Sequence, residues 1–268
     1  MAEGLRIALA AQPDASAPAA ILAVLPVAIA ALLRRQRGEA PIWPDRTLST
    51  AADFLRMTHG TPASAAIVRA LDAYWTVVIE NGLNTSAFAA RTIASSGASL
   101  VSAVLGAWCA FTGPRHGGAP GPTLDMLDEA EAAADLDAWI ERKLAAGERL
   151  MGFGHRVFRH GDPRTVAIGE ALAWLGRDVD RLGFASKLER RVGATFERLK
   201  PGHRPLQQNI EINAALLLDA AGFARDAFTP VFAIGRCPGW IAHALEQRAE
   251  QRLVRPSARY IGPEPRDS

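Results

Sequence analysis

Apolar residues recur at helical spacing along nearly every long segment of the chain. Leu136, Ile140 and Leu144 are four positions apart, Trp139 lies beside them, and together they form one apolar face. Runs of four or more residues that alternate between apolar and polar, as in a half-buried strand, are almost absent. The pattern therefore predicts an all-α fold.

Local signals predict where further helices begin and end. Thr61 followed by Pro62 is typical of a helix start, with Thr61 as N-cap and Pro62 at the first helical position. The helix that they open would carry one apolar stripe, made of Ile67, Leu71, Tyr74, Trp75 and Val78. Residues 86–111 are rich in Ala, Ser and Gly, which suits closely packed helices. Residues 211–221 predict a buried helix that Gly222 ends.

The apolar run of residues 17–33 was tested as a membrane segment. It holds 17 residues and is interrupted by Pro26, whereas a spanning helix needs about 20 apolar residues. A signal peptide begins with basic residues, but this N-terminus carries Glu3. We expect instead a buried core helix that starts near Pro26 and ends at Arg34 and Arg35, because cations suit a helix C-terminus. No membrane partner is expected.

Glycine and proline divide the chain into two expected lobes. Residues 117–122 are a Gly- and Pro-rich break, and the chain beyond them is more charged until about residue 205. We expect a small domain over residues 118–221, inserted into a large domain that residues 1–117 and 222–268 form together.

Composition narrows the classes of function. The 268 residues include 30 Lys and Arg against 28 Asp and Glu, a net charge of +2 that gives no basic footprint for nucleic acid. The two cysteines, Cys109 and Cys237, lie among apolar or turn residues and form no disulfide framework, which fits the reducing cytoplasm. The six histidines lack ligand spacing with cysteines or carboxylates, so no metal site is predicted.

Two histidines are bracketed by glycines. His116 lies within residues 113–118, and His155 lies within residues 151–164, where Asp-Pro-Arg ends the segment. Glycine lets backbone and ligand approach an imidazole closely. Histidine titrates nearest neutrality, so it is the natural acid or base at such a place. Both segments indicate binding and proton transfer.

Arginines near these histidines are candidates to bind a carboxylate. The fork of Arg164 matches a carboxylate bidentately, and we interpret Asp162 as a local cap or arginine partner rather than a base. Arg236 interrupts an apolar run and needs a partner, either an internal salt bridge or an anionic substrate. Arg255 by itself would be interpreted as a surface residue.

At this point the motifs resemble those of the citrate synthase family, in order and at suitable spacing, from about residue 45 to 263. The matching segments are Thr-Gly-Pro-Arg-His-Gly-Gly-Ala at 112–119, Met-Gly-Phe-Gly-His-Arg-Val-Phe-Arg-His-Gly-Asp-Pro-Arg at 151–164, Phe-Ala-Ile-Gly-Arg at 232–236, Gly-Trp-Ile-Ala-His at 239–243, Arg-Pro-Ser-Ala-Arg-Tyr-Ile-Gly-Pro at 255–263 and Leu-Asn-Thr-Ser-Ala-Phe-Ala-Ala-Arg at 83–91. The chain is shorter than the family norm in the N-terminal part of the large domain.

The resemblance implies an all-helical homodimer that condenses an acyl-CoA such as acetyl-CoA with a 2-oxo acid such as oxaloacetate. His116 would hydrogen-bond the thioester oxygen, and His155 would donate to the ketone. Arg164, Arg236 and, from the partner subunit, Arg255 would bind the carboxylates. Acyl-CoA would be a co-substrate, with no permanently bound cofactor.

The coenzyme A side of the site is implied in the same way. The backbone around Met151, Gly152, Phe153 and Gly154 would lie near coenzyme A. On charge alone, four side chains are candidates for its phosphates, with a solvated face as the alternative. These are Lys143, Arg149, Arg156 and Arg159.

Two positions depart from the family pattern. Where the family has His-x-x-His, this chain has Val78 and Asn81, and the second of those histidines binds the oxo acid. Asparagine donates a hydrogen bond but carries no charge, so a less charged oxo acid should fit better. Where the family has Asn-Val-Asp, whose aspartate removes the methyl proton, this chain has Glu211. Its extra methylene would misplace the base, and about 1 Å can cost on the order of 100-fold in rate.

Three functions, two catalytic and one non-catalytic, are consistent with these residues. The first is condensation of an acyl-CoA with a 2-oxo acid, with Glu211 as a repositioned base. The second is cleavage of a citryl-CoA-like thioester at the same site. The third is a non-catalytic homologue that binds a CoA ester or pairs with a full-length synthase as a hetero-oligomer. Sequence alone does not separate the first two.

Overall fold

The structure is a computed structural model and describes residues 1–113, 116–118, 120–155, 157–158, 161–176 and 179–262. These residues form α-helices and one short 3-10 helix, and they contain no strand, which confirms the all-α fold. The first half holds α1 (Ala2–Ala10), α2 (Pro18–Gln36), α3 (Thr50–His59), α4 (Ala65–Val78), α5 (Thr85–Ser95), α6 (Leu100–Phe111) and α7 (Pro120–Glu131). The second half holds α8 (Leu136–Ala145), α9 (Arg164–Ala173), α10 (Val179–Leu199), α11 (Ile210–Ala220), η1 (Arg225–Ala227) and α12 (Phe228–Glu250).

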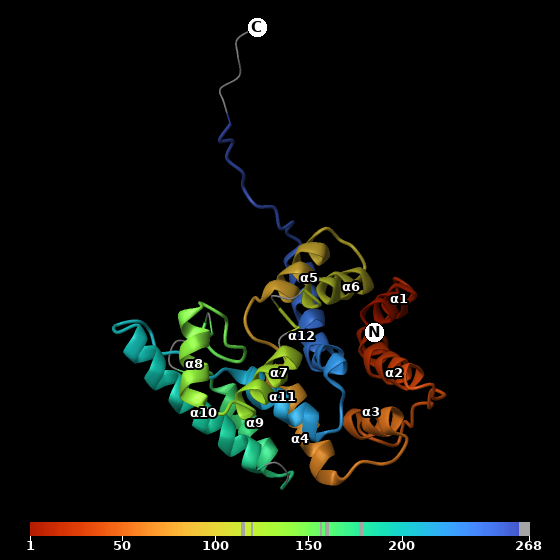
Figure 1. Cartoon of the computed structure of the whole chain (residues 1–268). Helices are drawn as coiled ribbons and strands as arrows, with labels where there is room; N and C mark the ends of the chain where they lie inside the picture. The colour runs from red at the N-terminus through yellow and green to blue at the C-terminus, as the bar shows by residue number, and fades with distance from the viewer. Residues whose placement is uncertain (114–115, 119, 156, 159–160, 177–178, 263–268) are drawn as a thin grey trace.

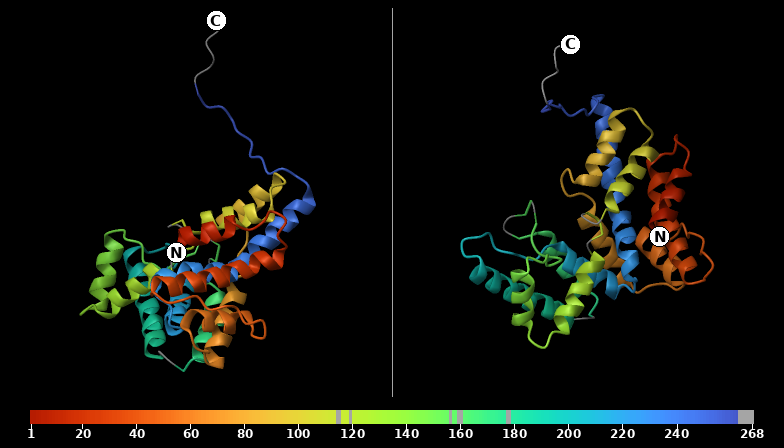
Figure 2. Two further views of the ribbon diagram at one scale, coloured as in Figure 1. Left: turned by 90° about the vertical axis from the view of Figure 1, so that its right-hand side faces the viewer. Right: turned by 45° about the horizontal axis from the view of Figure 1, so that its top comes forward.

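The long helix α12 runs through the middle of one group of helices. It packs against α2, α4, α5 and α6, and the views from two sides show α2 lying alongside it (Figure 2). A Cβ on Gly239 would lie 2.1 Å from the Ile79 carbonyl oxygen, and one on Gly235 would lie 2.7 Å from Trp75. Only glycine at these two positions allows the end of α4 to lie directly on α12. The contact places the turn after α4 beside Arg236.

A second group of helices lies on the other side of α7 and α11. There α8 packs against α10, and α9 packs against both α11 and α4 (Figure 1). The first turns of α9 and α11 thus face the group that contains α12. Residues 118–221 include all of α7 to α11. That these residues form a separate small domain stays a prediction.

Two expected helix starts are wrong. The helix expected from Pro26 begins at Pro18 and has Pro26 in its interior, because the buried stripe of Ile21, Leu25 and Ile29 runs past the proline. Packing of that stripe outweighs the one backbone hydrogen bond that an internal proline removes. The helix expected from Thr61 begins at Ala65, where the Ser64 hydroxyl caps the backbone N–H of Ile67 at 3.4 Å.

Among the described residues, α2 is the one helix that is long and apolar enough to cross a membrane. It lies near the N-terminus, and a third of its most apolar window is buried inside the protein. Its buried side packs against α1, α3 and α12.

Candidate functional site

His116 lies in the turn between α6 and α7 and is held by Ser86 at the start of α5. Its Nε2 accepts the backbone N–H of Ser86 at 3.3 Å and lies 2.8 Å from the Ser86 hydroxyl oxygen. That hydroxyl accepts the indole N–H of Trp240 at 2.9 Å, and its single proton has two acceptors within reach, Nε2 of His116 and Asn84 Oδ1, each 2.8 Å away. Because Nε2 acts as the acceptor, the ring proton of neutral His116 is assigned to Nδ1.

His116 is uncharged at neutral pH. Burial, followed by the field of Arg236, lowers its pKa to about 4. Its ring stands edge-on to Phe111, with 5.1 Å between the ring centroids. The ring is therefore already neutral at working pH, and its Nδ1–H is available as a hydrogen-bond donor.

The segment before His155 is pinned to the segment before α11. Gly154 N–H donates to the Gln207 carbonyl at 2.7 Å, and Asn209 N–H donates to the Gly152 carbonyl at 2.8 Å. The Asn209 side chain caps α11 by accepting the Glu211 N–H at 2.9 Å and donates to the Gly154 carbonyl at 2.8 Å. Gly152 has φ +78°, and a Cβ there would lie 2.4 Å from Ile212. These bonds fix the backbone of Glu211 relative to His155.

His155 takes the opposite tautomer to His116. Its Nδ1 accepts the backbone N–H groups of Val157 and Phe158, each at 3.1 Å. The ring proton therefore belongs on Nε2, which lies 3.3 Å from Nη2 of Arg164. Burial, then the charge of Arg164, lowers the pKa of His155. Two donors that face each other so closely form a site for one oxygen acceptor from a ligand.

Asp162 organises this loop, as the sequence predicted for a cap and arginine partner. Its carboxylate accepts from Arg164 Nε at 2.8 Å and Nη2 at 2.7 Å, and it also accepts the backbone N–H of Ile210 at 3.1 Å. Burial would raise the pKa of Asp162, but the Arg164 hydrogen bonds outweigh it and hold that pKa below its ordinary value. Asp162 thus joins the first turns of α9 and α11 and is not free to act as a base.

Arg236 is a buried cation in α12, 3% exposed. Its Nε donates to the Val78 carbonyl at the end of α4, and its guanidinium lies 5.0 Å from the Phe232 ring centroid. Burial, then the nearby charge of Arg164, lowers its pKa to about 10, so it stays charged at neutral pH. Within the described part of the chain no carboxylate forms a salt bridge with it. A substrate anion would supply the missing partner.

Glu211 occupies the first turn of α11. Burial raises its pKa to about 7, although Arg164 and Arg236 act in the opposite direction. No described residue hydrogen-bonds its carboxylate. A carboxylate with this pKa is well matched to take a proton near neutral pH.

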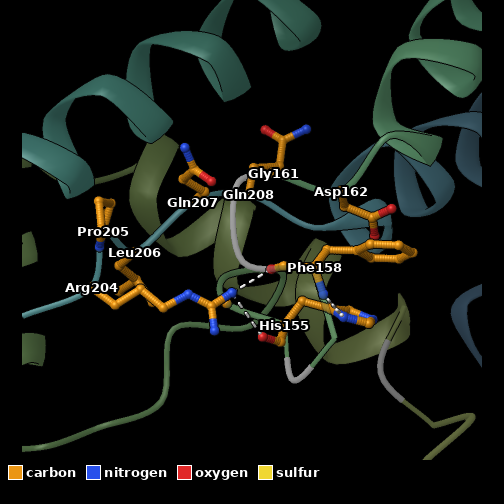
Figure 3. Close-up of a pocket in the computed structure, with 10 residues that line it drawn as sticks. His155, Phe158, Gly161, Asp162, Arg204, Pro205, Leu206, Gln207 and Gln208 are labelled. Atoms are coloured by element: carbon orange, nitrogen blue, oxygen red, sulfur yellow. Dashed lines mark hydrogen bonds between the residues drawn. The ribbon is translucent and has the colours of Figure 1, made fainter.

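A cavity of about 150 Å³ lies beside His155. It is lined by Gly154, His155, Phe158, Gly161, Asp162, Arg204, Pro205, Leu206, Gln207 and Gln208. Figure 3 shows Arg204 reaching from the far wall to the carbonyl groups of His155, at 3.3 Å, and Phe158. Sequence reasoning missed Arg204, Gln207 and Gln208; their position just before the Asn-Ile-Glu segment was the available signal.

The structure leaves several predicted residues apart from this cluster. Asn81 is half-buried in the turn after α4, and its side chain has no hydrogen-bond partner among the described residues. Arg255 is exposed on the arm that leaves the body after α12 (Figure 1). Lys143 pairs with Glu129 at 3.1 Å and Glu148 at 2.8 Å, so acidic neighbours balance its charge. Arg149 is exposed, and Arg156 and Arg159 lie outside the described residues.

No group of three or more His, Cys, Asp or Glu side chains in the described part of the chain could hold a metal ion. Cys237 is buried, and burial raises the pKa of its thiol to about 12, whereas Cys109 is exposed. Neither cysteine takes part in the cluster.

Comparisons with known proteins match most of the chain to one family. Residues 5–257 match the family model described as citrate synthase, C-terminal domain. The 2-methylcitrate synthase of Mycobacterium tuberculosis is 36% identical over 248 residues, which are 92% of this chain and 61% of that protein. The chain spans 58 to 64% of the length of the curated relatives it matches.

Solved structures show the same fold. Citrate synthase from Thermotoga maritima matches with a TM-score of 0.85 at 29% identity, over 100% of this chain and 73% of that one. Citryl-CoA lyase from Hydrogenobacter thermophilus matches with a TM-score of 0.70 at 26% identity, over 83% of this chain and 87% of that one. From these matches and the site it carries, the chain belongs to the citrate synthase family.

Proposed function

We propose that this chain condenses an acyl-CoA, acetyl-CoA or a close homologue, with a 2-oxo acid. The observation that carries the proposal is the pair of opposite tautomers. His116 presents Nδ1–H and His155 presents Nε2–H, and both rings are neutral because their pKa values are lowered. A condensation needs two such donors, one for each carbonyl oxygen that gains electron density.

The first step would form an enolate from the thioester, stabilised by a hydrogen bond. Glu211 removes a proton from the carbon next to the thioester carbonyl, and the C–H electron pair becomes the new carbon–carbon double bond. The carbonyl π electrons move to oxygen, where Nδ1–H of His116 hydrogen-bonds the developing charge. Glu211 suits this role because its pKa of about 7 makes it a stronger base than an ordinary carboxylate.

The second step would form the carbon–carbon bond. The double-bond electrons of the enolate form the new bond to the ketone carbon of the oxo acid, while the electrons on its oxygen re-form the thioester carbonyl. The ketone π electrons move to the ketone oxygen, which takes the proton of His155 Nε2, and the proton that Glu211 removed is returned to His155 through solvent. Arg164 and Arg236 bind the oxo acid's carboxylate groups. Water then hydrolyses the thioester and releases the coenzyme A thiol.

The acyl-CoA would enter along the cavity that His155 and Arg204 line. Gly154 at the end of the segment from Met151 lines this cavity, and the backbone of Gly152 and Gly154 is hydrogen-bonded to that of residues 207 and 209. Residues from α4 and α12 meet residues from α9 and α11 around the reacting atoms. Closure of the two helix groups would exclude water from the enolate.

The exposed arm supports a homodimer as the working unit. Arg255 lies on it, away from Arg164 and Arg236, together with Leu253, Tyr260 and Ile261, which are 58, 74 and 93% exposed. Apolar side chains this exposed on a soluble cytoplasmic protein are expected to pack on a second chain. Arg255 would then complete the anion site of the partner subunit.

The test is thiol release from acetyl-CoA and propionyl-CoA across a panel of 2-oxo acids, with His155→Ala as the control. Release that depends on His155 supports condensation. Release that survives His155→Ala, or none with any pair, would overturn it.

Cleavage of a citryl-CoA-like thioester is the second candidate, favoured by the likeness to the Hydrogenobacter thermophilus lyase. It would run the same bond changes in reverse. Formation of acetyl-CoA and oxaloacetate from citryl-CoA, faster than thiol release in the forward direction, would favour it. Co-purification with a longer synthase and no turnover would favour the non-catalytic role.

A further inference from the structure

A buried hydroxyl group near the candidate site has no partner. Tyr74 in α4 is 1% exposed, and its hydroxyl is one of two buried side-chain polar atoms without a hydrogen bond among the described residues, the other being Thr58 Oγ1. An unpaired buried hydroxyl destabilises the folded protein, so its presence calls for a reason.

Tyr74 lies where three charged elements meet. Its helix α4 packs against α9, α11 and α12, and these carry Arg164, Glu211 and Arg236 respectively. The Tyr74 ring contacts the Phe232 ring, 6.2 Å between centroids, and the Arg236 guanidinium also lies against Phe232, 5.0 Å from its ring centroid.

The electrostatics agree with this placement. Burial, then the charge of Glu211, raises the pKa of Tyr74 well above its ordinary value, while Arg236 and Arg164 act in the opposite direction. The phenol is therefore protonated at any working pH and is a hydrogen-bond donor. The charged groups that influence Glu211 are Arg164, Arg236, Asp162 and Arg149.

Glu211 needs such a donor more than an aspartate would. Its side chain has one more rotatable bond, and none of the described residues hydrogen-bonds its carboxylate. Asp162 and Asn209 accept the backbone N–H groups of Ile210 and Glu211. These bonds fix the backbone at the start of α11 but do not hold the Glu211 carboxylate. A base that is free to rotate spends part of its time away from the substrate carbon.

We infer that Tyr74 is a positioning residue for the proposed reaction: when the two helix groups close on substrate, its hydroxyl donates to one carboxylate oxygen of Glu211 and leaves the other to take the proton. The inference rests on the proposed function and adds to it a residue that positions the carboxylate of Glu211. In the ligand-free protein the hydroxyl has no hydrogen-bond partner among the described residues.

Tyr74→Phe tests this, with Thr58→Val as the matched control. Both variants remove an unpaired buried hydroxyl, so both should raise the ligand-free Tm, by about 2 °C. Only Tyr74→Phe should lower kcat, about tenfold, and move the acid limb of the kcat–pH profile up by about one unit. The acid limb of kcat/KM, which reports the ligand-free enzyme, should stay in place.

The double variant Tyr74→Phe with Glu211→Asp gives a second check. The shorter aspartate does not reach the hydroxyl, so losing it should change kcat less than twofold in that background. Equal losses in both backgrounds, a lowered Tm, or an unmoved kcat limb would each overturn the inference.

A wild type without turnover would end the proposed function but still leave Tyr74 testable. The pKa of Glu211 is then followed by NMR on protein labelled with ¹³C-glutamate, with Glu211→Gln for assignment. Adding acetyl-CoA and oxaloacetate should lower that pKa in the wild type and not in Tyr74→Phe. The same change in both proteins, or none in either, would count against the inference.

Discussion

The backbone N–H of Ser86 points at Nε2 of His116 across 3.3 Å, and the Ser86 hydroxyl lies 2.8 Å from the same nitrogen. This contact joins the start of α5 to the turn before α7 and leaves Nδ1 as the ring nitrogen of His116 that carries the proton. Ser86 is fully buried and also receives the indole N–H of Trp240. One small side chain therefore connects α5, α12 and a candidate catalytic histidine.

Replacing Ser86 with Ala should reduce both stability and turnover. The indole N–H of Trp240 loses its acceptor, which should cost about 1 to 3 kcal/mol in the free energy of unfolding. The backbone N–H still holds His116, so kcat should fall about tenfold rather than vanish. Urea unfolding and steady-state thiol release measure the two effects. Unchanged unfolding in Ser86→Ala would show that the Trp240 bond contributes nothing.

The raised pKa of Glu211 predicts opposite effects of pH on activity and stability. The base must be ionised, so kcat/KM should rise with pH until about 7. His116, with a pKa of about 4, stays neutral as the pH rises to 7, so its titration does not contribute to this rise in kcat/KM. Because the folded protein binds the Glu211 proton more tightly than the unfolded chain, stability is lost as pH rises from 4.5 to about 7.

Glu211→Gln isolates this effect on stability. It should raise the Tm at pH 8, where the wild type carries a buried charge, and change the Tm little at pH 4, where Glu211 is protonated. Thermal unfolding at both pH values checks it. A larger gain at pH 4 than at pH 8 would contradict the assignment of the pKa.

Shortening the base by one methylene should slow the reaction. Glu211→Asp would raise activity if the site kept the family's geometry. The backbone N–H groups of Ile210 and Glu211, however, donate to Asp162 and Asn209, and these bonds hold the start of α11 in place. We expect kcat to fall on the order of 100-fold with KM nearly constant. A faster Glu211→Asp variant would mean that the site still favours aspartate.

Asn81 offers a test of oxo acid charge. Asn81→His adds a hydrogen-bond donor that can carry a positive charge. Such a donor should raise the affinity for an oxo acid with a second carboxylate about tenfold. The KM for oxaloacetate should fall about tenfold relative to that for pyruvate. Asn81→Gln keeps a neutral amide and should leave the ratio unchanged. Equal changes for both oxo acids would show that position 81 does not read charge.

Close packing of α4 on α12 predicts a stability difference between two glycines. A Cβ on Gly239 would lie 2.1 Å from the Ile79 carbonyl oxygen, so Gly239→Ala should destabilise the protein by about 1 to 3 kcal/mol. Gly183 in α10 has open space around it, and Gly183→Ala should stabilise by about 0.5 to 1 kcal/mol. Chemical unfolding of both variants compares them. A neutral Gly239→Ala would mean that α12 shifts freely.

Local sequence predicted the helices well and two of their starts poorly. An apolar face over residues 136–144 predicted the helix from Leu136 to Ala145, and the helix predicted over residues 211–221 is the one from Ile210 to Ala220. Thr61 and Pro62 form a plausible start, yet Ser64 caps the helix. Choosing between neighbouring caps depends on which residues the rest of the fold buries, and that is not a local property.

The sequence by itself determined the helical class, the family, and the residue types that would move protons and bind carboxylates. Only the tertiary structure decided which nitrogen of each histidine donates, because Ser86 and His116 are 30 positions apart and meet through packing. It also decided that Glu211 has a pKa of about 7 and that the buried Tyr74 hydroxyl has no hydrogen-bond partner among the described residues. Burial and the field of distant charges set those properties, and they exist only once the helices have assembled.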